Sequence, residues 1–420
     1  MKKYLIVILM VTLGIAPAWA VPNKKPVAPA KASAQTTSKK AAAPAKAAKQ
    51  TPARPKVSAQ APATEPLVPF KAFIVVEAQT GKMLEGENIH LPLPPASITK
   101  LMLAAIVMDR LESGQIKLDD KVTVSQAAAG MGGSQVFLKP GESFTLEEMM
   151  KAVLIASGND AAYAVAEHVA GTAEAFIKLM NEKAKALNMA DSEFHSVHGL
   201  PPSKGQQEDS SSCSDLAILA RELLKYPKIL EWTSVPSAGF RDNKFIMNNH
   251  NKLLFKFPGT DGLKTGYYRE TGFNVAATAK RNDLRFIVVV LGSPSAKIRD
   301  NVAIEKFKKA FAQYKALPVV KKGDLIDKEI ILADGKPGKI KGVAGADFIY
   351  PIAFDSKGTA TKEIRVPGKI KGEVKQGQKL GDLVIKFANQ EVGQVDIVSP
   401  VNVPKANFFI RLLRKVGIGL

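Results

Sequence analysis

The chain of 420 residues is 46% hydrophobic and 23% charged, which is ordinary for globular proteins and leaves room for two or three domains. Its one cysteine, Cys213, excludes an intrachain disulfide and a cysteine-based zinc cage, and its five histidines show no metal-binding spacing such as HExxH, so we expect no metal and no cofactor. The formal net charge is +20, and residues 1–65, with eleven Lys or Arg and one Glu, carry half of it.

The first twenty residues have the pattern of a secretory signal peptide. Residues 1–3 are basic at Lys2 and Lys3, residues 4–15 are mostly apolar, and residues 18–20 supply small residues around a cleavage site after position 20. A membrane anchor is the alternative, but roughly twelve apolar residues are too few to span a bilayer. We therefore expect export. Because export excludes a role such as transcription, the basic charge points to an anionic envelope surface and not to nucleic acid.

Residues 21–65 have the composition of a linker. They contain fourteen Ala, seven Pro, eight Lys and one Arg, and no aromatic residue. Such a segment cannot bury enough apolar surface to offset the entropy lost on ordering. We expect an extended basic linker, and a tether to the cell wall or to lipid is the alternative.

Residues 66–318 alternate between strand and helix patterns. The apolar run 72–76, followed by a turn at Gly81 and residues 83–84, predicts a first hairpin, and the runs 273–279 and 285–291 predict a second. Between and beyond these hairpins the periodicity predicts helices after Pro95, from Leu146 to about Ala156 behind a capping box of Thr145 and Glu148, and at 160–170, 173–187, 214–225 and 296–315. This order indicates an α+β domain built on an antiparallel sheet.

Two smaller units are expected after this domain. Residues 319–402 show short alternating runs separated by glycine turns, which predicts a small all-β domain. Residues 403–420 form an amphipathic pattern, with Phe408 and Phe409 on one helix face and Arg411 on the other. A basic amphipathic helix suits the surface of an anionic membrane, and packing against the β domain is the alternative.

Ser97 and Lys100 are the first candidate catalytic pair. They lie three residues apart at the start of the helix that follows Pro95, so both side chains share one face. A serine hydroxyl is a poor nucleophile unless a base takes its proton, and a lysine becomes such a base when burial or neighbouring cations lower its pKa. Alone the pair is a weak signal, because Ser-x-x-Lys arises by chance about once in a chain of this length.

Two further motifs strengthen the catalytic interpretation. Ser157-Gly158-Asn159 follows the second predicted helix, and Lys264-Thr265-Gly266 precedes the second hairpin. Ser-x-x-Lys, Ser-x-Asn and Lys-Thr-Gly in this order form the signature of active-site serine penicillin-recognising enzymes.

Over residues 70–420 the chain resembles the low-molecular-mass penicillin-binding proteins that act as D-alanyl-D-alanine carboxypeptidases. Beyond the three motifs, the resemblance rests on the segments 77–82, 137–141, 197–200 and 261–263 and on the order of the β domain and the terminal helix. It implies a β-lactamase/DD-peptidase-like fold, the peptidoglycan stem peptide ending in D-Ala-D-Ala as substrate, and β-lactams as covalent inhibitors. It also implies a place at the outer face of the cytoplasmic membrane.

The resemblance also implies roles for the motif residues. Ser97 would form the acyl-ester, Lys100 would take its proton, and Ser157 would relay a proton to the leaving amine. Asn159 would hold the substrate amide. The remaining implied substrate contacts are Lys264 and Thr265 on the terminal carboxylate, Gly266 as the point of close backbone approach, and the N–H groups of Ser97 and Tyr267 as the oxyanion hole.

The motifs assign no role to the side chains of three other residues. Tyr267 stands where the family often has histidine, which leaves the role of its side chain open. Arg299 would add positive potential near the carboxylate, but we expect a surface charge there. His198 is expected to be a structural turn residue and not a catalyst.

Other functions also fit parts of the pattern. A class A β-lactamase shares the three motifs and adds a glutamate that drives deacylation, and Glu193 lies at a suitable distance after Ser157. The residues after Glu193 do not fit that family, and the β domain and the terminal helix also argue against it. An endopeptidase that cuts cross-links would keep the same fold. A non-enzymatic envelope scaffold is the third alternative.

Overall fold

The computed structural model describes residues 68–415, with side chains described as far as Arg411. The predicted signal peptide and the predicted linker lie outside the described residues, and so do the last five residues of the predicted terminal helix. Within residues 68–415, no helix has both the length and the apolar character that a membrane crossing requires.

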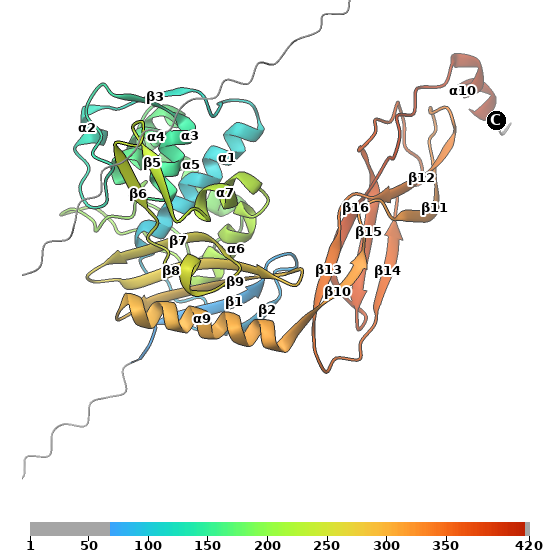
Figure 1. Cartoon of the computed structure of the whole chain (residues 1–420). Helices are drawn as coiled ribbons and strands as arrows, with labels where there is room; N and C mark the ends of the chain where they lie inside the picture. The colour runs from blue at the N-terminus through green and yellow to red at the C-terminus, as the bar shows by residue number, and fades with distance from the viewer. Residues whose placement is uncertain (1–67, 416–420) are drawn as a thin grey trace, which may run out of the picture. The chain divides into compact units, whose positions relative to one another are not determined.

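A five-stranded antiparallel sheet, in the order β2-β1-β9-β8-β7, forms the centre of the first domain (Figure 1). Both predicted hairpins are confirmed, and they pair with each other through β1 and β9. The prediction missed β7, which carries the Lys-Thr-Gly motif. The strands are β1 (Ala72–Glu77), β2 (Met83–Glu87), β7 (Thr260–Tyr268), β8 (Gly272–Arg281) and β9 (Leu284–Ser293).

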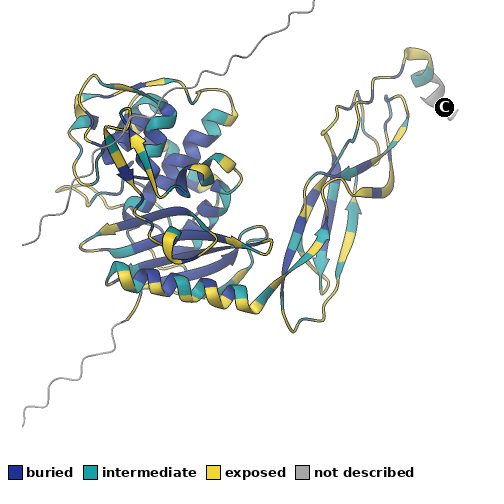
Figure 2. Ribbon diagram, in the orientation of Figure 1, coloured by how far each residue is buried: buried dark blue, intermediate teal, exposed yellow. Residues whose placement is uncertain are grey.

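Successive side chains of a strand point to opposite sides, and both faces of the central strands β1, β8 and β9 are buried. Ile74 and Val76 of β1 pack into the larger helical core, whereas Phe73 and Val75 pack into a second core. Helix α9 (Ala296–Gln313) covers that second core, and Figure 2 shows its outer side exposed. Two covered faces explain why β1 and β9 are almost continuously apolar.

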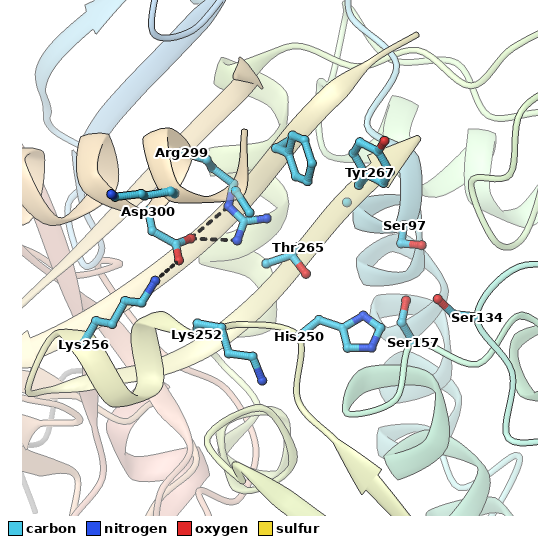
Figure 3. Close-up of a pocket in the computed structure, with 14 residues that line it drawn as sticks. Ser97, Ser134, Ser157, His250, Lys252, Lys256, Thr265, Tyr267, Arg299 and Asp300 are labelled. Atoms are coloured by element: carbon cyan, nitrogen blue, oxygen red, sulfur yellow. Dashed lines mark hydrogen bonds and ion pairs between the residues drawn. The ribbon is translucent and has the colours of Figure 1, made fainter. Parts of the chain in front are cut away.

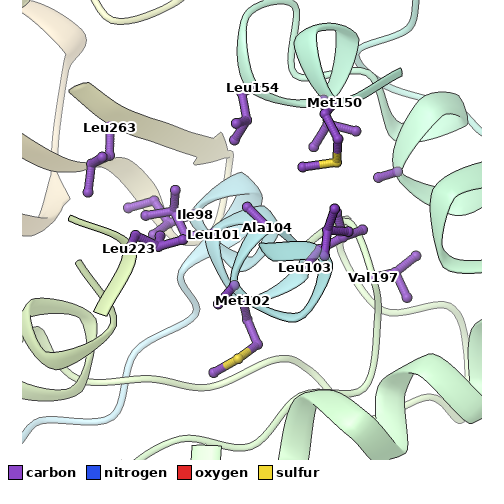
Figure 4. Close-up of a cluster of buried hydrophobic side chains, with 14 of the residues drawn as sticks. Ile98, Leu101, Met102, Leu103, Ala104, Met150, Leu154, Val197, Leu223 and Leu263 are labelled. Carbon is purple, nitrogen blue, oxygen red and sulfur yellow. The ribbon is translucent and has the colours of Figure 1, made fainter. Parts of the chain in front are cut away.

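Helix α1 (Lys100–Glu112) runs through the larger core. Every residue from Lys100 to Met108 is buried, so this helix is apolar on all sides and not amphipathic, as expected for a helix enclosed by others. Figure 4 shows Ile98, Leu101 and Leu103 packing against the surrounding elements. The first residue of α1 is the candidate base, so the fully buried part of this helix holds it.

The other predicted helices are confirmed to within about three residues at their ends. Thr145 accepts a hydrogen bond from the N–H of Glu148, whose carboxylate accepts one from the N–H of Thr145, which is the predicted capping box. Cys213 is fully buried at the start of α6. The helices are α3 (Leu146–Leu154), α4 (Asn159–Ala170), α5 (Ala173–Ala186) and α6 (Cys213–Leu223).

Short elements that the sequence analysis did not predict complete this domain. They are η1 (Ala96–Thr99), α2 (Gln126–Ala129), α7 (Pro227–Thr233), α8 (Leu253–Lys256), and the hairpins β3 (Lys121–Thr123) with β4 (Ser143–Thr145) and β5 (Ser237–Phe240) with β6 (Phe245–Asn248).

The second domain is all β, as predicted, and has its own apolar core. Helix α9 ends at Gln313, slightly before the predicted end, because Tyr314 already begins a strand. The strands form a two-stranded sheet, β10-β13, and a five-stranded sheet, β11-β12-β16-β15-β14. Their bounds are β10 (Tyr314–Val320), β11 (Leu325–Ile331), β12 (Lys339–Ala344), β13 (Phe348–Ala353), β14 (Ala360–Arg365), β15 (Lys379–Phe387) and β16 (Gln390–Val398).

Helix α10 (Phe408–Lys415) is the described part of the predicted terminal helix. The side chains of Phe408 and Phe409 are 65% and 73% exposed. Two neighbouring aromatic rings at a chain end are therefore left uncovered by the described residues.

Candidate active site

Ser97 lies in a tight turn that two distant segments press against. The preceding residue, Ala96, has a φ of +52°, a strained conformation for a residue with a Cβ. A Cβ at Gly266 of β7 would lie 2.4 Å from the carbonyl oxygen of Pro95, and a Cβ at Gly199 would lie 2.1 Å from that of Ala96. Only glycine permits these approaches, so backbone on two sides fixes the position of Ser97.

The ammonium group of Lys100 is buried and held by three acceptors. Its Nζ lies 3.1 Å from Ser97 Oγ, 2.7 Å from Asn159 Oδ1 and 2.6 Å from the carbonyl oxygen of His198. Burial, with a smaller contribution from the positive charge of Lys264, holds the pKa of Lys100 well below its usual range. A lysine with a lowered pKa next to a serine hydroxyl can take the proton of that hydroxyl.

Ser157 and Asn159 sit where α3 gives way to α4. Ser157 has a φ of +62° and borders the same cavity as Ser97. Asn159 receives the hydrogen bond from Lys100 at Oδ1 and donates one from Nδ2 to the carbonyl oxygen of Gly132 at 2.7 Å. Both ends of this amide are engaged, so Asn159 positions Lys100, and its contact with substrate stays a prediction.

Lys264 and Thr265 lie on β7, which flanks the serine turn. Thr265 borders the cavity, whereas Lys264 lies behind it, 2% exposed, and donates to the carbonyl oxygen of Thr265 at 3.0 Å. Burial, together with the positive charge of Arg299, lowers the pKa of Lys264 to about 7. The edge strand β7 thus holds a second lysine with a lowered pKa close to the turn that carries Ser97.

These residues surround a cavity of about 500 Å³. Figure 3 shows Ser97, Ser134 and Ser157 gathered at one side, Thr265 in the middle, and Arg299 with Asp300 and Lys256 at the other side. Positive charge predominates in the lining, which suits a ligand with a carboxylate. The cavity residues that the sequence analysis did not identify are Ser134, His250, Lys252, Lys256, Phe273, Ala296, Lys297 and Asp300.

The expectation that Arg299 is a surface charge is wrong. Its side chain is 5% exposed and lies 2.7 Å from Asp300, which also pairs with Lys256. The error has a physical cause: Arg299 lies one turn after the helix cap Ser295, on the side of α9 that faces the sheet. Arg299 therefore adds buried positive charge to the cavity.

Tyr267 is 54% exposed at the cavity and stacks on Phe273, with 4.1 Å between the ring centroids. His250 also borders the cavity, and burial, with nearby lysines and Arg299, lowers its pKa to about 4. His250 is therefore neutral near neutral pH. No local sequence pattern marks His250, because its place depends on how the segment before β7 folds back on the sheet.

His198 and Glu193 lie outside the cavity lining. The ring nitrogen Nδ1 of His198 accepts a hydrogen bond from the N–H of Leu200, and burial lowers its pKa to about 3. This geometry supports the structural turn role. Glu193 is paired with His195, and its side chain is 66% exposed, so it is not placed as a base beside Ser97.

Among the described residues, no group of three or more His, Cys, Asp or Glu side chains is placed to hold a metal ion. The polar groups that converge on the cavity are instead mostly hydroxyls, ammonium groups and a guanidinium, with one imidazole and one carboxylate.

Together, the serine, its lysine partner and the positively charged cavity define an active-site serine hydrolase. Residues 58–295 match the family model described as D-alanyl-D-alanine carboxypeptidase, and residues 314–405 match the penicillin-binding protein 5 C-terminal domain. The chain belongs to the D-alanyl-D-alanine carboxypeptidase family.

Characterised relatives support this assignment along most of the chain. The chain is 37% identical over 355 residues to D-alanyl-D-alanine carboxypeptidase DacF of Bacillus subtilis, covering 83% of this chain and 89% of that one. It is 31% identical over 364 residues to DacC of Escherichia coli, covering 84% and 89%.

Solved structures agree. Penicillin-binding protein 5 from Haemophilus influenzae is similar with a TM-score of 0.63 at 26% identity, covering 81% of this chain and 99% of that one. A protein described as a peptidoglycan synthesis regulatory factor (PBP3), from Streptococcus pneumoniae, has a TM-score of 0.68 at 26% identity, covering 80% and 99%.

Proposed function

We propose that this protein is a serine-type D-alanyl-D-alanine carboxypeptidase that removes the terminal D-alanine from peptidoglycan pentapeptides and is inhibited covalently by penicillin. One observation carries the proposal: the buried Lys100 Nζ, whose pKa is lowered, lies 3.1 Å from Ser97 Oγ. This pair can generate a nucleophile without a histidine.

In the acylation step, Ser97 Oγ attacks the carbonyl carbon of the penultimate D-alanine and Lys100 accepts the hydroxyl proton. The N–H groups of Ser97 and Tyr267 stabilise the developing oxyanion, and one such donor is typically worth about 10²–10³ in rate. Ser157 relays the proton from Lys100 to the leaving amine, which leaves Lys100 neutral for the second step. The peptide bond breaks, free D-alanine departs, and the shortened peptide remains as an ester on Ser97.

In the deacylation step, a water molecule replaces D-alanine in the cleft. Lys100 takes a proton from this water, which then attacks the ester carbonyl. The ester bond breaks, Ser97 recovers its proton, and the peptide leaves with a new carboxylate. The same lysine thus serves both halves of the reaction.

The positive side of the cavity selects the substrate. A terminal carboxylate placed along β7 lies against Thr265, with Lys264 and Arg299 behind it. Binding an anion there offsets the repulsion between these two buried cations, which favours the charged form of Lys264. The stacked rings of the exposed Tyr267 and the half-buried Phe273 give an apolar border for the methyl groups of the substrate.

Mass spectrometry after incubation with labelled benzylpenicillin tests this proposal. We expect one adduct per chain, mapped to the peptide that contains Ser97, and none in Ser97→Ala. The variant should also lose D-alanine release from a pentapeptide. An adduct on another residue, or full D-alanine release by Ser97→Ala, would overturn the proposal. The second result would mean that a contaminating enzyme releases D-alanine, and it would favour a non-enzymatic scaffold.

A β-lactamase is the second candidate, since it shares the three motifs. The exposed, paired position of Glu193 disfavours it, because the site then lacks an added base for fast deacylation. Penicillin turnover separates the two functions: a long-lived acyl-enzyme supports the carboxypeptidase, and rapid turnover supports the β-lactamase. Assays with cross-linked dimers would detect endopeptidase activity.

We also propose that residues 403–420 hold the exported protein at the outer face of the cytoplasmic membrane. The exposed Phe408 and Phe409, next to Arg411 on a basic helix, support this placement. Deleting residues 403–420 should release active protein from membranes. Persistent membrane binding by the shortened chain would contradict the proposal.

A further inference from the structure

Asp209 is a buried carboxylate that lies outside the three motifs. It sits in the segment before α6 and is 6% exposed. Its Oδ1 accepts hydrogen bonds from the N–H groups of His195 at 2.7 Å and Ser196 at 2.8 Å. Its Oδ2 accepts from Ser196 Oγ at 2.8 Å and from Thr99 Oγ1 at 3.0 Å. Four donors on one buried carboxylate make a well-defined junction.

The donors come from two segments that meet at the base. Thr99 is the residue between the serine turn and Lys100. Ser196 begins a loop that also contains His198 and Gly199. The carbonyl oxygen of His198 accepts a hydrogen bond from Lys100, and Gly199 packs on the serine turn. Ser196 Oγ also accepts a hydrogen bond from the N–H of Gly199 at 2.8 Å. Asp209 therefore links both sides of the pocket that holds the Lys100 ammonium group.

We propose that Asp209 is a positioning residue for acylation, which holds the turn of Ser97 and Lys100 against the loop that accepts the Lys100 hydrogen bond. This proposal rests on the proposed role of Lys100 as the base. Burial raises the pKa of Asp209, whereas its four donors favour the ionised carboxylate, which places a negative charge near the lysine.

That charge acts against the other influences on Lys100. Burial and Lys264 on β7 lower the pKa of Lys100, whereas Asp209 and Asp160 on α4 raise it. The remaining titratable groups close to the lysine are His198 on the loop and His250 at the cavity, and both are neutral imidazoles near neutral pH. Removing the charge of Asp209 thus leaves only one carboxylate to support the protonated lysine.

The variant Asp209→Asn tests this role with little change of shape. Its amide oxygen can still accept from the two backbone N–H groups, and its amide nitrogen can donate to the two hydroxyls, which rotate. We expect the acylation rate with benzylpenicillin at neutral pH to fall by about tenfold, because the serine turn and the loop are held less precisely. We further expect the acid limb of the pH profile to move to lower pH, since Lys100 then deprotonates more easily.

The direction of this shift distinguishes charge from loosened structure. If the substitution merely let water reach Lys100, burial would weaken and the acid limb would move to higher pH. The matched control is Asp215→Asn, another carboxylate that is 2% exposed and accepts from the N–H of Asp191 and from Ser192 Oγ. This control should lose stability and keep the wild-type pH profile.

A second variant separates the link from the charge. Thr99→Val removes the hydroxyl that reaches Asp209 and keeps both the side-chain shape and the carboxylate. It should slow acylation severalfold and leave the acid limb unchanged.

The possible outcomes are distinct. An acid limb in Asp209→Asn that stays in place or moves to higher pH would overturn the role of Asp209. Wild-type acylation by Lys100→Ala would instead overturn the proposed role of Lys100 as the base. Measuring both variants side by side therefore shows which proposal has failed.

Discussion

Lysines in the catalytic cleft and lysines in the ion pairs of the β domain behave in opposite ways. In the catalytic cleft, Lys100 and Lys264 are almost fully buried, and burial lowers the pKa of each. In the β domain, Lys341 and Lys379 are about half exposed and paired with aspartates, and hydrogen bonds to those partners raise their pKa. Desolvation outweighs partners inside the cleft, whereas partners outweigh desolvation at the surface.

The comparison assigns a different purpose to each set of charges. A buried lysine with a lowered pKa is costly for the fold and is suited to proton transfer. An exposed ion pair is screened by solvent, adds little stability and helps solubility. Substitutions in the cleft should therefore change chemistry, and substitutions in the β-domain pairs should change almost nothing.

Lys100→Ala should give the largest effect. Without the base, acylation by benzylpenicillin should slow by about 10²–10⁴-fold, as is typical when a general base is lost. Stopped-flow measurement of acylation, with circular dichroism to verify folding, would test this. The matched control is Lys225→Ala, which removes an exposed lysine outside the cavity lining and should acylate at close to the wild-type rate. Equal losses in both variants would break the comparison.

Lys264→Arg should change the pH dependence of substrate binding. Lys264 has a pKa of about 7 in the free cleft, so its charge is present below pH 7 and is lost as the pH rises above it. Affinity for the substrate carboxylate should fall as the pH rises above 7, so KM should rise on the alkaline side. Arginine remains charged, so this rise should disappear in the variant. A pH series of steady-state kinetics would detect it, and an unchanged alkaline rise would assign it to another group.

Arg285→Ala tests an intermediate case. Arg285 forms two hydrogen bonds of 2.7 Å to the carboxylate of Asp261, at the start of β7, and both side chains are about one-fifth exposed. Charge-assisted bonds at this depth are worth more than surface pairs, so we expect a loss of about 1–2 kcal/mol in the free energy of unfolding. Urea denaturation would measure this loss. A change below the error of the method would place this pair with the surface pairs.

Lys341→Ala should give the smallest effect. The Lys341–Asp327 pair is exposed on the β domain, so solvent already satisfies both groups. We expect no measurable change in thermal stability or in D-alanine release. A clear drop in the melting temperature would show that such pairs support the β domain after all, and would weaken the contrast drawn between the two domains.

Local patterns predicted much of this structure. The capping box at Thr145, the two hairpins and the three motifs all depend on residues close together in the chain. The sequence also allowed the pairing of Ser97 with Lys100 to be inferred, since three residues are nearly one helical turn.

The contacts that tune the site were not predictable in this way. Asp209 and Thr99 are 110 residues apart, and their meeting depends on the folding of the whole helical core. Arg299 was misjudged because charged residues are usually exposed, although it lies on the same side of α9 as the buried Ala303 and Phe307. In both cases the role depends on burial against distant segments.

The sole thiol of the chain offers a practical opportunity. Cys213 is enclosed in the core, and burial raises its pKa, so maleimide reagents have neither access nor a thiolate to attack. A cysteine introduced at an exposed position, such as Phe409, would accept a fluorophore selectively in the otherwise native protein. Its emission would then report directly on whether the chain end enters lipid, and on how quickly it does so.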